Sequence, residues 1–200
     1  MTSPVHSRPD EIHAIPYNRA GAALRRDIAL LQHGVAPPGD PPPSDPIPPE
    51  HDPRLDALSF YLMADGRVVS YAAVVHKQIR HGDAMFWIAG LSCVATDPDY
   101  QGRGLGSRIV GAATRCIEHS TTDIGIFTCD PPLAAFYARA GAWPVAPDVV
   151  LIGSRHDGAL SSVSLRKVVL MRLFSAKAQA AVGQLRQTTI DLDLPLGQFL

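Results

Sequence analysis

The stretch VATDPDYQGRGLGS, residues 94–107, decides the fold of this chain. An apolar run leads into a turn at Asp97-Pro98, then into a loop with three close-set glycines, and then into a helical pattern. Glycines permit positive φ and let a ligand approach the backbone closely. The first amides of the following helix have no partners within it, and together with the helix dipole they attract anions. The stretch therefore predicts a strand, a phosphate-binding loop and a helix, in that order.

Two common phosphate-binding motifs do not fit this loop. A Walker A loop needs a lysine after its glycines, and none follows here. The dinucleotide fingerprint G-x-G-x-x-G would need a glycine where Ser107 or Ile109 stands. Arg103 and Arg108 add positive charge to the loop and first turns. A glycine-rich turn that binds no ligand is the alternative that these residues alone leave open.

The segments around the loop predict an α/β fold in which a mixed sheet of about seven strands is flanked by helices. Asp65-Gly66 between two β-rich runs predicts a hairpin. The uninterrupted apolar run at residues 84–96 predicts a central strand buried on both faces. The expected strands are residues 11–17, 57–63, 68–77, 84–96, 123–129, 143–152 and 165–174, and the expected helices are residues 19–33, 104–119 and 131–140.

Three further expectations concern the second half of the chain. Asp130 is placed to cap the helix at residues 131–140, and Gly141 is placed to end it. The strands at residues 143–152 and 165–174 are expected to pair with each other around the loop between them. The tail, residues 175–200, predicts a helical piece followed by an extended segment.

Composition favours one domain, residues 1–200, and excludes several classes of function. The chain is 46% hydrophobic and 18% charged, which suits a buried core. A net charge of −1 argues against a protein whose main role is to bind the phosphates of nucleic acid, because that role needs a basic surface. No apolar stretch in the middle of the chain reaches the ~20 residues of a bilayer span, and the first ten residues lack an apolar leader. Three cysteines without CxxC spacing disfavour disulfides and zinc. We therefore expect a cytoplasmic protein with no nucleic-acid partner, no membrane partner and no metal.

A proline-rich segment interrupts the pattern at residues 36–53, which hold nine of the eighteen prolines. Proline fixes φ and lacks an amide proton, so this segment cannot form a helix or a central strand. We expect an extended or mobile surface loop. Either it is a tolerated insertion, or it acts as a lid over a substrate pocket.

The glycine loop resembles a known family. The sequence QGRGLG, residues 101–106, fits Q/R-x-x-G-x-G/A, the pyrophosphate loop of the GNAT superfamily of acyl-CoA N-acyltransferases. About thirty residues later, LAAFYARAGAW at residues 133–143 is similar to the superfamily signature A-x-x-F/L-Y-x-x-x-G-F/W. The resemblance covers residues 57–152, about half of the chain, and implies a GNAT-like sheet that splays between its two central parallel strands.

The resemblance also implies a site for acetyl-CoA as the acyl donor. Pantetheine would pair with the strand before the loop through the backbone of Val94 and Thr96, and an amide near Cys93 or Val94 would polarise the thioester carbonyl. Tyr137 would protonate the leaving thiolate as general acid, or else be a core aromatic. Asp130 stands where many members carry Asn, so it would contact the donor or only cap a helix. The full set expected at the donor is Cys93, Val94, Ala95, Thr96, Gln101, Gly102, Arg103, Gly104, Leu105, Gly106, Ser107, Asp130 and Phe136.

The acceptor in this superfamily is an amine, which must lose a proton to a base. The sequence offers Ser92, Asp83, Asp191, Asp193 and His76 as candidates. His76 is equally well explained as a structural histidine. With period 2, Asp191 and Asp193 would share one side of an extended tail. There they would bind a cationic amine or form the solvent face of an edge strand, so they and Ser92 are the expected substrate contacts.

A finer resemblance concerns the substrate. Residues 68–84 and the helix LRRDIALL, residues 24–31, look like the aminoglycoside N-acetyltransferases of the 2-prime type. Ser92 departs from that family, which places Glu there, and the proline-rich segment is foreign to it. We expect an N-acetyltransferase that acts on a primary amine of a small molecule, an aminoglycoside or another amine. The alternatives are a longer acyl-CoA as donor, or a non-catalytic domain that binds CoA or a partner. Superfamily members often form homodimers, so a homodimer is expected too.

Overall fold

The computed structural model describes residues 11–36, 39, 43, 44 and 47–200. The expectation of no apolar leader falls on residues 1–10, outside the described residues. The expectation of an extended or mobile loop falls partly on residues 37–38, 40–42 and 45–46, which also lie outside them. Within the described part of the chain, no helix is long and apolar enough to cross a bilayer.

The core of the molecule is one mixed sheet. Each strand is antiparallel to its neighbours except the central pair β4 and β5, which run parallel. This arrangement confirms the predicted sheet, with six strands in place of about seven. In spatial order the strands are β1 (His13–Pro16), β2 (Leu58–Ala64), β3 (Arg67–His81), β4 (Ala84–Thr96), β5 (Ile124–Cys129) and β7 (Val168–Leu173).

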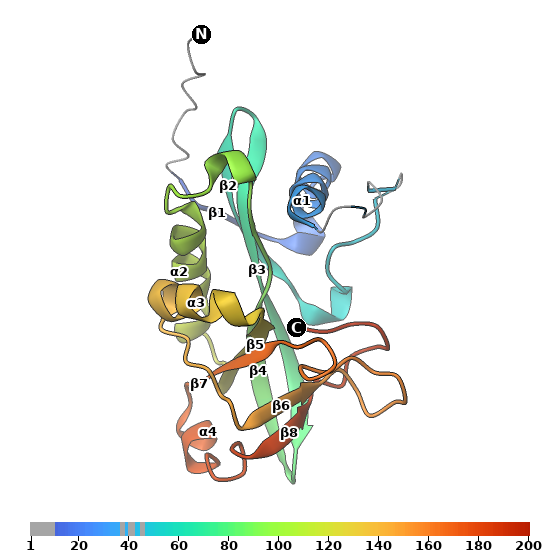
Figure 1. Ribbon diagram of the computed structural model, residues 1–200, viewed down its shortest axis with the longest axis vertical. Helices are drawn as coiled ribbons and strands as arrows, with labels where there is room; N and C mark the ends of the chain where they lie inside the picture. Colours follow the sequence, from blue (N-terminus) through green and yellow to red (C-terminus); the bar gives the residue numbers. More distant parts are fainter. Residues whose placement is uncertain (1–10, 37–38, 40–42, 45–46) are drawn as a thin grey trace.

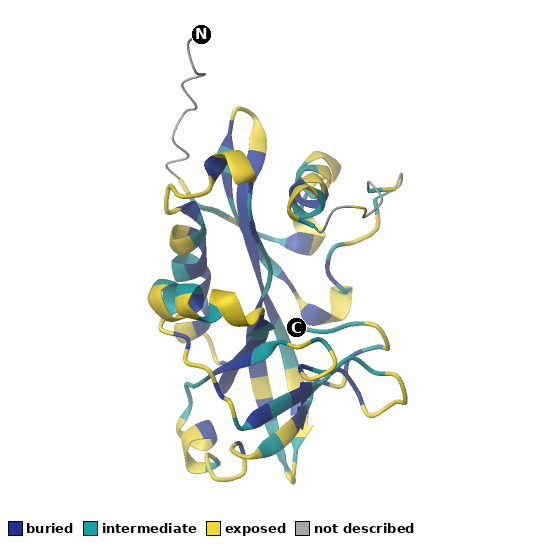
Figure 2. Ribbon diagram, viewed as in Figure 1, coloured by how far each residue is buried: buried dark blue, intermediate teal, exposed yellow. Residues whose placement is uncertain are grey.

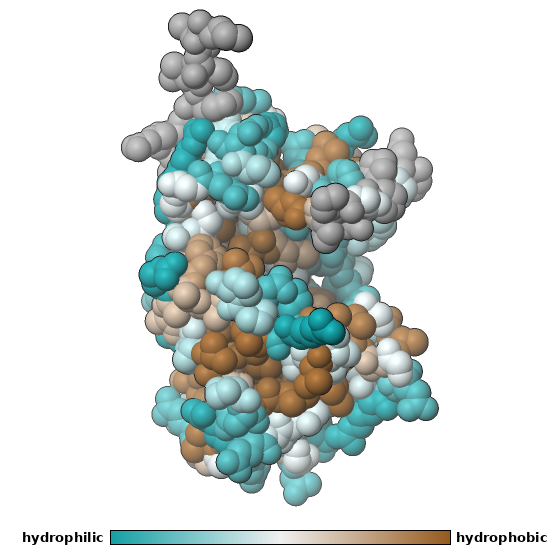
Figure 3. Space-filling model, in the orientation of Figure 1, coloured by the Kyte–Doolittle hydropathy of each residue, from teal (hydrophilic) through white to brown (hydrophobic). Residues whose placement is uncertain are grey.

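Helices cover both faces of the sheet, which makes a three-layer fold (Figure 1). Helix α1 (Ala22–Val35) lies on one face, and α2 (Leu105–Glu118) and α3 (Ala134–Gly141) lie on the other. Two separate hydrophobic clusters result, one on each face, and the strands between them are the most deeply buried part of the chain (Figure 2). Apolar residues also reach the surface around α3 and over the strands beside it (Figure 3).

Short 3-10 helices join these elements. They are η1 (Tyr17–Arg19), η2 (Pro53–Leu55), η3 (Pro98–Tyr100) and η4 (Pro131–Leu133), and three of the four begin with proline, whose fixed φ suits a first helical position. The η2 turn closes the proline-rich segment, so that segment leads directly into β2.

The predicted hairpin and central strand are both confirmed. Asp65 and Gly66 adopt φ of 51° and 77°, as a two-residue hairpin turn requires, and they join β2 to β3. Strand β4 has the bounds that the apolar run predicts. It is not buried along its whole length, because Trp87 near its start is 49% exposed and residues 92–94 near its end are half-buried.

The predicted pairing of residues 143–152 with residues 165–174 is wrong. Strand β7 pairs with β5 along its whole length, and β6 (Val149–Ile152) pairs in parallel with β8 (Thr188–Asp191) in a small second sheet. Trp143 does not extend a strand, because it is fully buried and its indole N–H donates to Thr114 Oγ1 at 2.8 Å. Only an isolated bridge joins Val145 to β7.

Both ends of the helical segment after β5 differ from expectation. Asp130 makes no side-chain cap; its carboxylate accepts a hydrogen bond from Lys167 Nζ at 2.8 Å instead. The left-handed residue that ends α3 is Ala142, with φ of 52°, and not Gly141. Gly141 is required for another reason: a Cβ there would lie 2.5 Å from Thr114 Oγ1 and 2.7 Å from the Trp143 ring.

The tail follows the predicted order. Ser175 caps α4 (Ala176–Ala180) by accepting a hydrogen bond from the Ala178 amide, and the extended segment after it supplies β8. The end of the tail returns to the sheet, where Thr128 Oγ1 of β5 donates to the carbonyl of Leu200 at 2.5 Å.

Candidate active site

The two parallel strands separate soon after they meet. β4 and β5 are in register only at Ile88–Ile124 and Ala89–Gly125. Beyond them, residues 91–96 of β4 have no strand on the β5 side in the part of the chain that the structure describes. The predicted splay is therefore present, and it leaves a strand edge whose backbone groups can pair with an extended ligand.

A β-bulge lies on β4 where the strands have separated. Tyr71 of β3 is opposite Ala95 and Ala73 is opposite Ser92, so Cys93 and Val94 together face a single residue. Cys93 holds a φ of 52°, a strained value for a residue with a side chain. Its carbonyl accepts a hydrogen bond from Gln32 Nε2 of α1 at 2.7 Å, which fixes the bulge. Bulges re-aim local peptide groups, and this one does so beside the gap.

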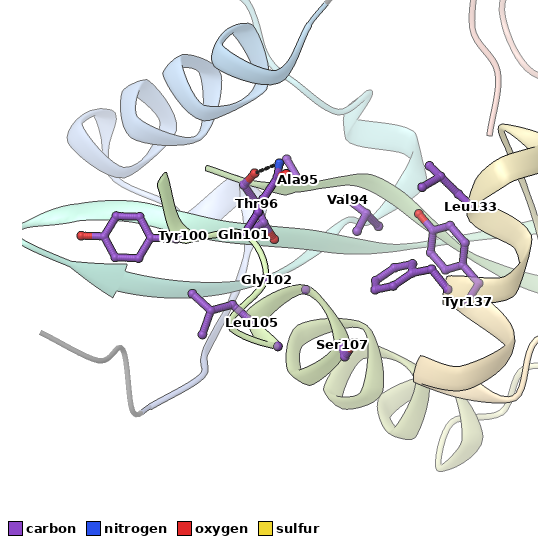
Figure 4. Close-up of a pocket in the computed structure, with 13 residues that line it drawn as sticks. Val94, Ala95, Thr96, Tyr100, Gln101, Gly102, Leu105, Ser107, Leu133 and Tyr137 are labelled. Atoms are coloured by element: carbon purple, nitrogen blue, oxygen red, sulfur yellow. Dashed lines mark hydrogen bonds between the residues drawn. The ribbon is translucent and has the colours of Figure 1, made fainter. Parts of the chain in front are cut away.

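The turn after β4 is held from both sides. Asp97 accepts a hydrogen bond from the Asp99 amide at 2.9 Å and pairs with Arg67, while Tyr100 donates to Asp65 at 2.6 Å. Gln101 Nε2 donates to the Thr96 carbonyl at 3.0 Å (Figure 4). The glycine loop is thus fastened to the end of β4. One lone pair of the Thr96 carbonyl is thus already engaged, which leaves the second lone pair and the amide for pantetheine.

The glycine loop presents its amides without internal partners. Gly102 and Gly104 have φ of 72° and 77°, which favours glycine at both. The first backbone hydrogen bond of the helix runs from the Arg108 amide to the Gly104 carbonyl at 3.0 Å. No backbone carbonyl of the described residues accepts a hydrogen bond from the amides of residues 102–107. These six amides lie at the positive end of α2, an arrangement that favours the binding of an anion.

A cavity of about 440 Å³ joins the loop to the opened strand edge. The absence of a side chain at Gly106 lets α2 pack closely against Thr96 and Phe136, because a Cβ there would lie 3.2 Å from Thr96 Oγ1 and 3.5 Å from the Phe136 ring. The cavity brings together most of the predicted donor residues and adds Tyr100 and Leu133, which the sequence analysis did not select. Its lining is Val94, Ala95, Thr96, Tyr100, Gln101, Gly102, Gly104, Leu105, Gly106, Ser107, Leu133, Phe136 and Tyr137.

Three predicted donor residues lie outside this cavity. The Cys93 side chain packs with the hydrophobic cluster on the α1 face. Arg103 stacks over the Tyr100 ring at 5.0 Å and donates to the Asp99 carbonyl at 2.8 Å. Asp130 pairs with Lys167. Their side chains are therefore occupied elsewhere.

Tyr137 is the one acid in the cavity wall that the superfamily signature selects. It is only 6% exposed and packs edge-on against Phe127 and Phe136, with ring centres 5.1 and 5.0 Å away. Its hydroxyl makes no hydrogen bond with the described residues and points toward β4 near Val94 (Figure 4). Burial raises its pKa well above the ordinary 10, with smaller contributions from Cys129 and Asp130. The phenol therefore stays protonated at neutral pH and can donate.

The predicted bases do not gather at the cavity. Asp83 lies in the turn between β3 and β4, ten residues before Cys93 and so about 33 Å away along the strand. His76 of β3 lies opposite Ala89, and burial lowers its pKa. Ser92 alone adjoins the bulge, with its Oγ 3.5 Å from Cys93 Sγ.

The two tail aspartates keep the expected alternation. β8 ends at Asp191 and Asp193 has a φ of 49°, but Ile190, Leu192 and Leu194 are buried while Asp191 and Asp193 are more exposed. The Asp193 amide donates to Asp191 Oδ1 at 2.8 Å. Asp191 pairs with Arg155 at 3.0 Å, and Asp193 pairs with Lys77 at 3.1 Å. Asp193 lines a second cavity of about 440 Å³, together with Asp52 and other residues outside the first cavity. Among the described residues, no group of three or more potential ligands could hold a metal ion.

Comparisons with known proteins agree with this geometry. Residues 56–141 match the family model described as an acetyltransferase (GNAT) domain. The GNAT family N-acetyltransferase YhbS of Escherichia coli, solved in complex with CoA, superimposes with a TM-score of 0.56 at 16% identity, over 96% of this chain and 92% of that one. The chain has the GNAT fold.

Two other solved structures extend the comparison. An acyl-CoA N-acyltransferase from Pseudomonas aeruginosa matches with a TM-score of 0.54 and 15% identity, over 81% of this chain and 98% of that one. A probable N-acyltransferase from Enterococcus faecalis matches with a TM-score of 0.49 and 16% identity, over 64% of this chain but only 31% of its own length. No match was found among curated protein sequences.

The GNAT match leaves one notable residue outside its bounds. Glu50, in the proline-rich segment, lies before residue 56 where the match begins. Its Oε1 accepts a hydrogen bond from Cys93 Sγ at 3.4 Å, which places a carboxylate at the bulge. The sequence analysis missed Glu50, because it lies 43 residues from Cys93 and no motif surrounds it.

Proposed function

We propose that this protein is an N-acetyltransferase that moves the acetyl group of acetyl-CoA to a primary amine of a small molecule. One observation carries the proposal: a single cavity joins residues of the glycine loop whose amides have no backbone partners, the open edge of β4 and the side chain of Tyr137. These are the three features that binding a diphosphate, aligning an extended thioester and protonating a thiolate require.

The diphosphate of acetyl-CoA would bind the amides of residues 102–107. Each helix-terminal amide contributes little alone, so several acting together at the start of α2 supply the affinity. Pantetheine would extend along β4 from Thr96 toward Val94. A backbone amide at the bulge would then donate to the thioester carbonyl, where negative charge develops as the amine attacks.

Tyr137 would complete the transfer. The amine nitrogen forms a bond to the carbonyl carbon, the carbon–sulfur bond breaks, and the sulfur takes the proton of the Tyr137 hydroxyl. A phenol with a raised pKa is protonated throughout the neutral range, so its availability would not limit the rate there. A positioned acid of this kind contributes typically ~10²–10⁴-fold.

The acceptor is the least constrained part of the proposal. An aminoglycoside is one candidate, on the finer resemblance of residues 24–31 and 68–84. The two alternative functions make different demands on the cavity. A longer acyl chain would need room beside Leu133 and Phe136, whereas a domain that binds CoA without catalysis would not need Tyr137.

Two measurements test the function. Calorimetry with acetyl-CoA is expected to give a micromolar Kd, and release of free CoA is expected with at least one amine among spermidine, tobramycin, lysine and a peptide N-terminus. Binding without thiol release from any amine would favour a non-catalytic domain. No binding at all would overturn the assignment of the cavity.

A further inference from the structure

The bulge on β4 carries a carboxylate that the donor cavity does not use. Cys93 packs with the cluster on the α1 face, whereas Val94 packs with the cluster on the α2 face. The bulge is therefore in contact with both sides of the sheet. The donor cavity lies on the α2 side, so an amine can approach the thioester carbonyl from the other side. Glu50 stands on that side.

Glu50 is held in place by neighbours on both sides of its peptide. Its amide donates to the Tyr17 hydroxyl at 2.9 Å. The next residue, His51, is only 5% exposed; its Nε2 lies 2.8 Å from the Tyr71 hydroxyl, which lies 2.9 Å from Ser59 Oγ. The end of the proline-rich segment is thus anchored in the core under β2 and β3. These contacts hold the backbone of Glu50 in a defined position, although Glu50 follows a proline-rich stretch.

The charge of Glu50 has no cationic partner in the described part of the chain. Among the described residues, its side chain makes one hydrogen bond, with the neutral Cys93 thiol, whose pKa is raised to about 12, first by burial and then by the Glu50 charge. Glu50 itself is half-buried. A carboxylate is acceptor-only and strongly favours an ammonium group as partner. At this position it is therefore open to a cation supplied by a ligand.

We infer that Glu50 binds the ammonium group of the acceptor and takes its first proton, so that the described end of the proline-rich segment, residues 47–53, forms part of the acceptor site. This inference rests on the proposed function. It identifies the substrate class as amines that are cationic at neutral pH, and it makes His51 a positioning residue. Glu50 supplies what none of the sequence-predicted bases supplies, a carboxylate in contact with Cys93 at the bulge.

The reaction balances with these groups. The ammonium gives one proton to Glu50, which releases it to water. The lone pair of the neutral nitrogen then forms the bond to the carbonyl carbon, and the electron pair of the carbon–sulfur bond leaves with sulfur. Sulfur takes the Tyr137 proton, and the nitrogen's second proton restores Tyr137 directly or through water. The products are an amide, a thiol and one proton.

Glu50→Gln tests the inference, because glutamine keeps the shape and removes the charge. With the amine that the wild-type protein turns over fastest among spermidine, tobramycin and lysine, we expect kcat/KM at pH 7 to fall at least 100-fold. The Kd of acetyl-CoA should stay within twofold. Glu50→Asp, which keeps the charge on a shorter side chain, should retain more activity than Glu50→Gln. Glu11→Gln removes the same charge from an exposed residue before β1 and should change neither quantity.

A pH series separates this role from a structural one. Between pH 7 and 9.5 a growing share of the free amine is already neutral, so the deficit of Glu50→Gln should shrink more than tenfold. The titratable groups facing Glu50 are Cys93, Tyr17, His51 and Tyr71. The pKa of His51 is lowered to about 4, and those of Cys93 and Tyr71 are raised, so these three keep their charge state across this range.

Each outcome of these measurements either supports or overturns the role of Glu50. A deficit that shrinks with pH, with acetyl-CoA affinity intact, supports the inference. Full activity in Glu50→Gln, or a deficit of equal size at every pH, overturns it and leaves the proposed function standing. If the wild-type protein binds acetyl-CoA but releases thiol with none of spermidine, tobramycin, lysine and a peptide N-terminus, both the proposed function and this inference are wrong.

Discussion

The two faces of β4 are built in different ways. The donor face is assembled from residues close in sequence: the end of β4, the glycine loop and α2 follow one another within 25 residues, and only α3 comes from further on. The α1 face, which is the proposed acceptor face, joins residues 47–53, α1 and the bulge, whose contacts span 61 residues between Gln32 and Cys93 and 43 between Glu50 and Cys93. A motif can specify the first face, whereas only the complete fold specifies the second.

The largest test of this contrast is Tyr137→Phe on the donor face. The hydroxyl has no partner among the described residues and the ring is packed by Phe127 and Phe136, so phenylalanine should preserve the fold. We expect kcat to fall ~10²–10⁴-fold, because the thiolate loses its proton donor. The Kd of acetyl-CoA, measured by calorimetry, should be nearly unchanged. Unchanged turnover would remove Tyr137 from the mechanism.

The next test addresses the acceptor face through His51. Its pKa is lowered from 6.5 to about 4, because burial disfavours the charged ring. Below pH 6.5 His51 is therefore protonated in the unfolded chain but stays neutral in the native chain. The free energy of unfolding decreases as the pH drops from about 6.5 to 4. The shift of about 2.5 pH units corresponds to roughly 3 kcal/mol at most.

Urea unfolding between pH 7 and pH 4 measures this loss. His51→Gln should flatten the acid side of the profile, whereas His119→Gln, at an exposed histidine after α2, should leave it in place. If acid stability were the same in wild type and His51→Gln, the anchor under the proline-rich segment would carry no such linkage.

The smallest expected effect concerns the glycine loop. Gly104→Val forces a β-branched residue into a φ near 77°, at a cost of about 1–2 kcal/mol, and turns the neighbouring amides away from the diphosphate. We expect acetyl-CoA to bind about tenfold more weakly by calorimetry. Gly158→Val is the matched control, since Gly158 has a φ of 81° with open space around it and lies outside the cavity. It should lose similar stability but no affinity; equal affinities in both variants would count against the loop assignment.

The sequence predicted the strand, the hairpin and the loop around the first cavity well, for physical reasons. An uninterrupted apolar run has few ways to be buried other than as a central strand, so residues 84–96 gave the bounds of β4 correctly. Asp65-Gly66 permits positive φ at two successive positions and therefore specified the hairpin. The glycine loop and the signature around Tyr137 together indicated the cavity, whose lining includes eleven of the residues named in advance.

The failures share a cause, which is that tertiary partners replaced local ones. Trp143 has the β propensity of a strand residue, but Thr114 on α2 offers its indole a buried acceptor. Asp130 stands at the sequence position of a helix cap, but its carboxylate accepts a hydrogen bond from Lys167 instead. Glu50 gives no signal at all, because its place depends on His51 burying itself against Tyr71 and Ser59.

The parallel pairing of β6 with β8 bears on how the chain acquires its form during synthesis. The backbone of β6 gains its strand partner only when Thr188 of β8 is present. Further along the tail, Gln198 Nε2 donates to Oδ2 of Asp52, which lies two residues after Glu50, at 3.0 Å. On the ribosome, the small second sheet and the contact between Gln198 and Asp52 can therefore form only after residues 188–198 have emerged.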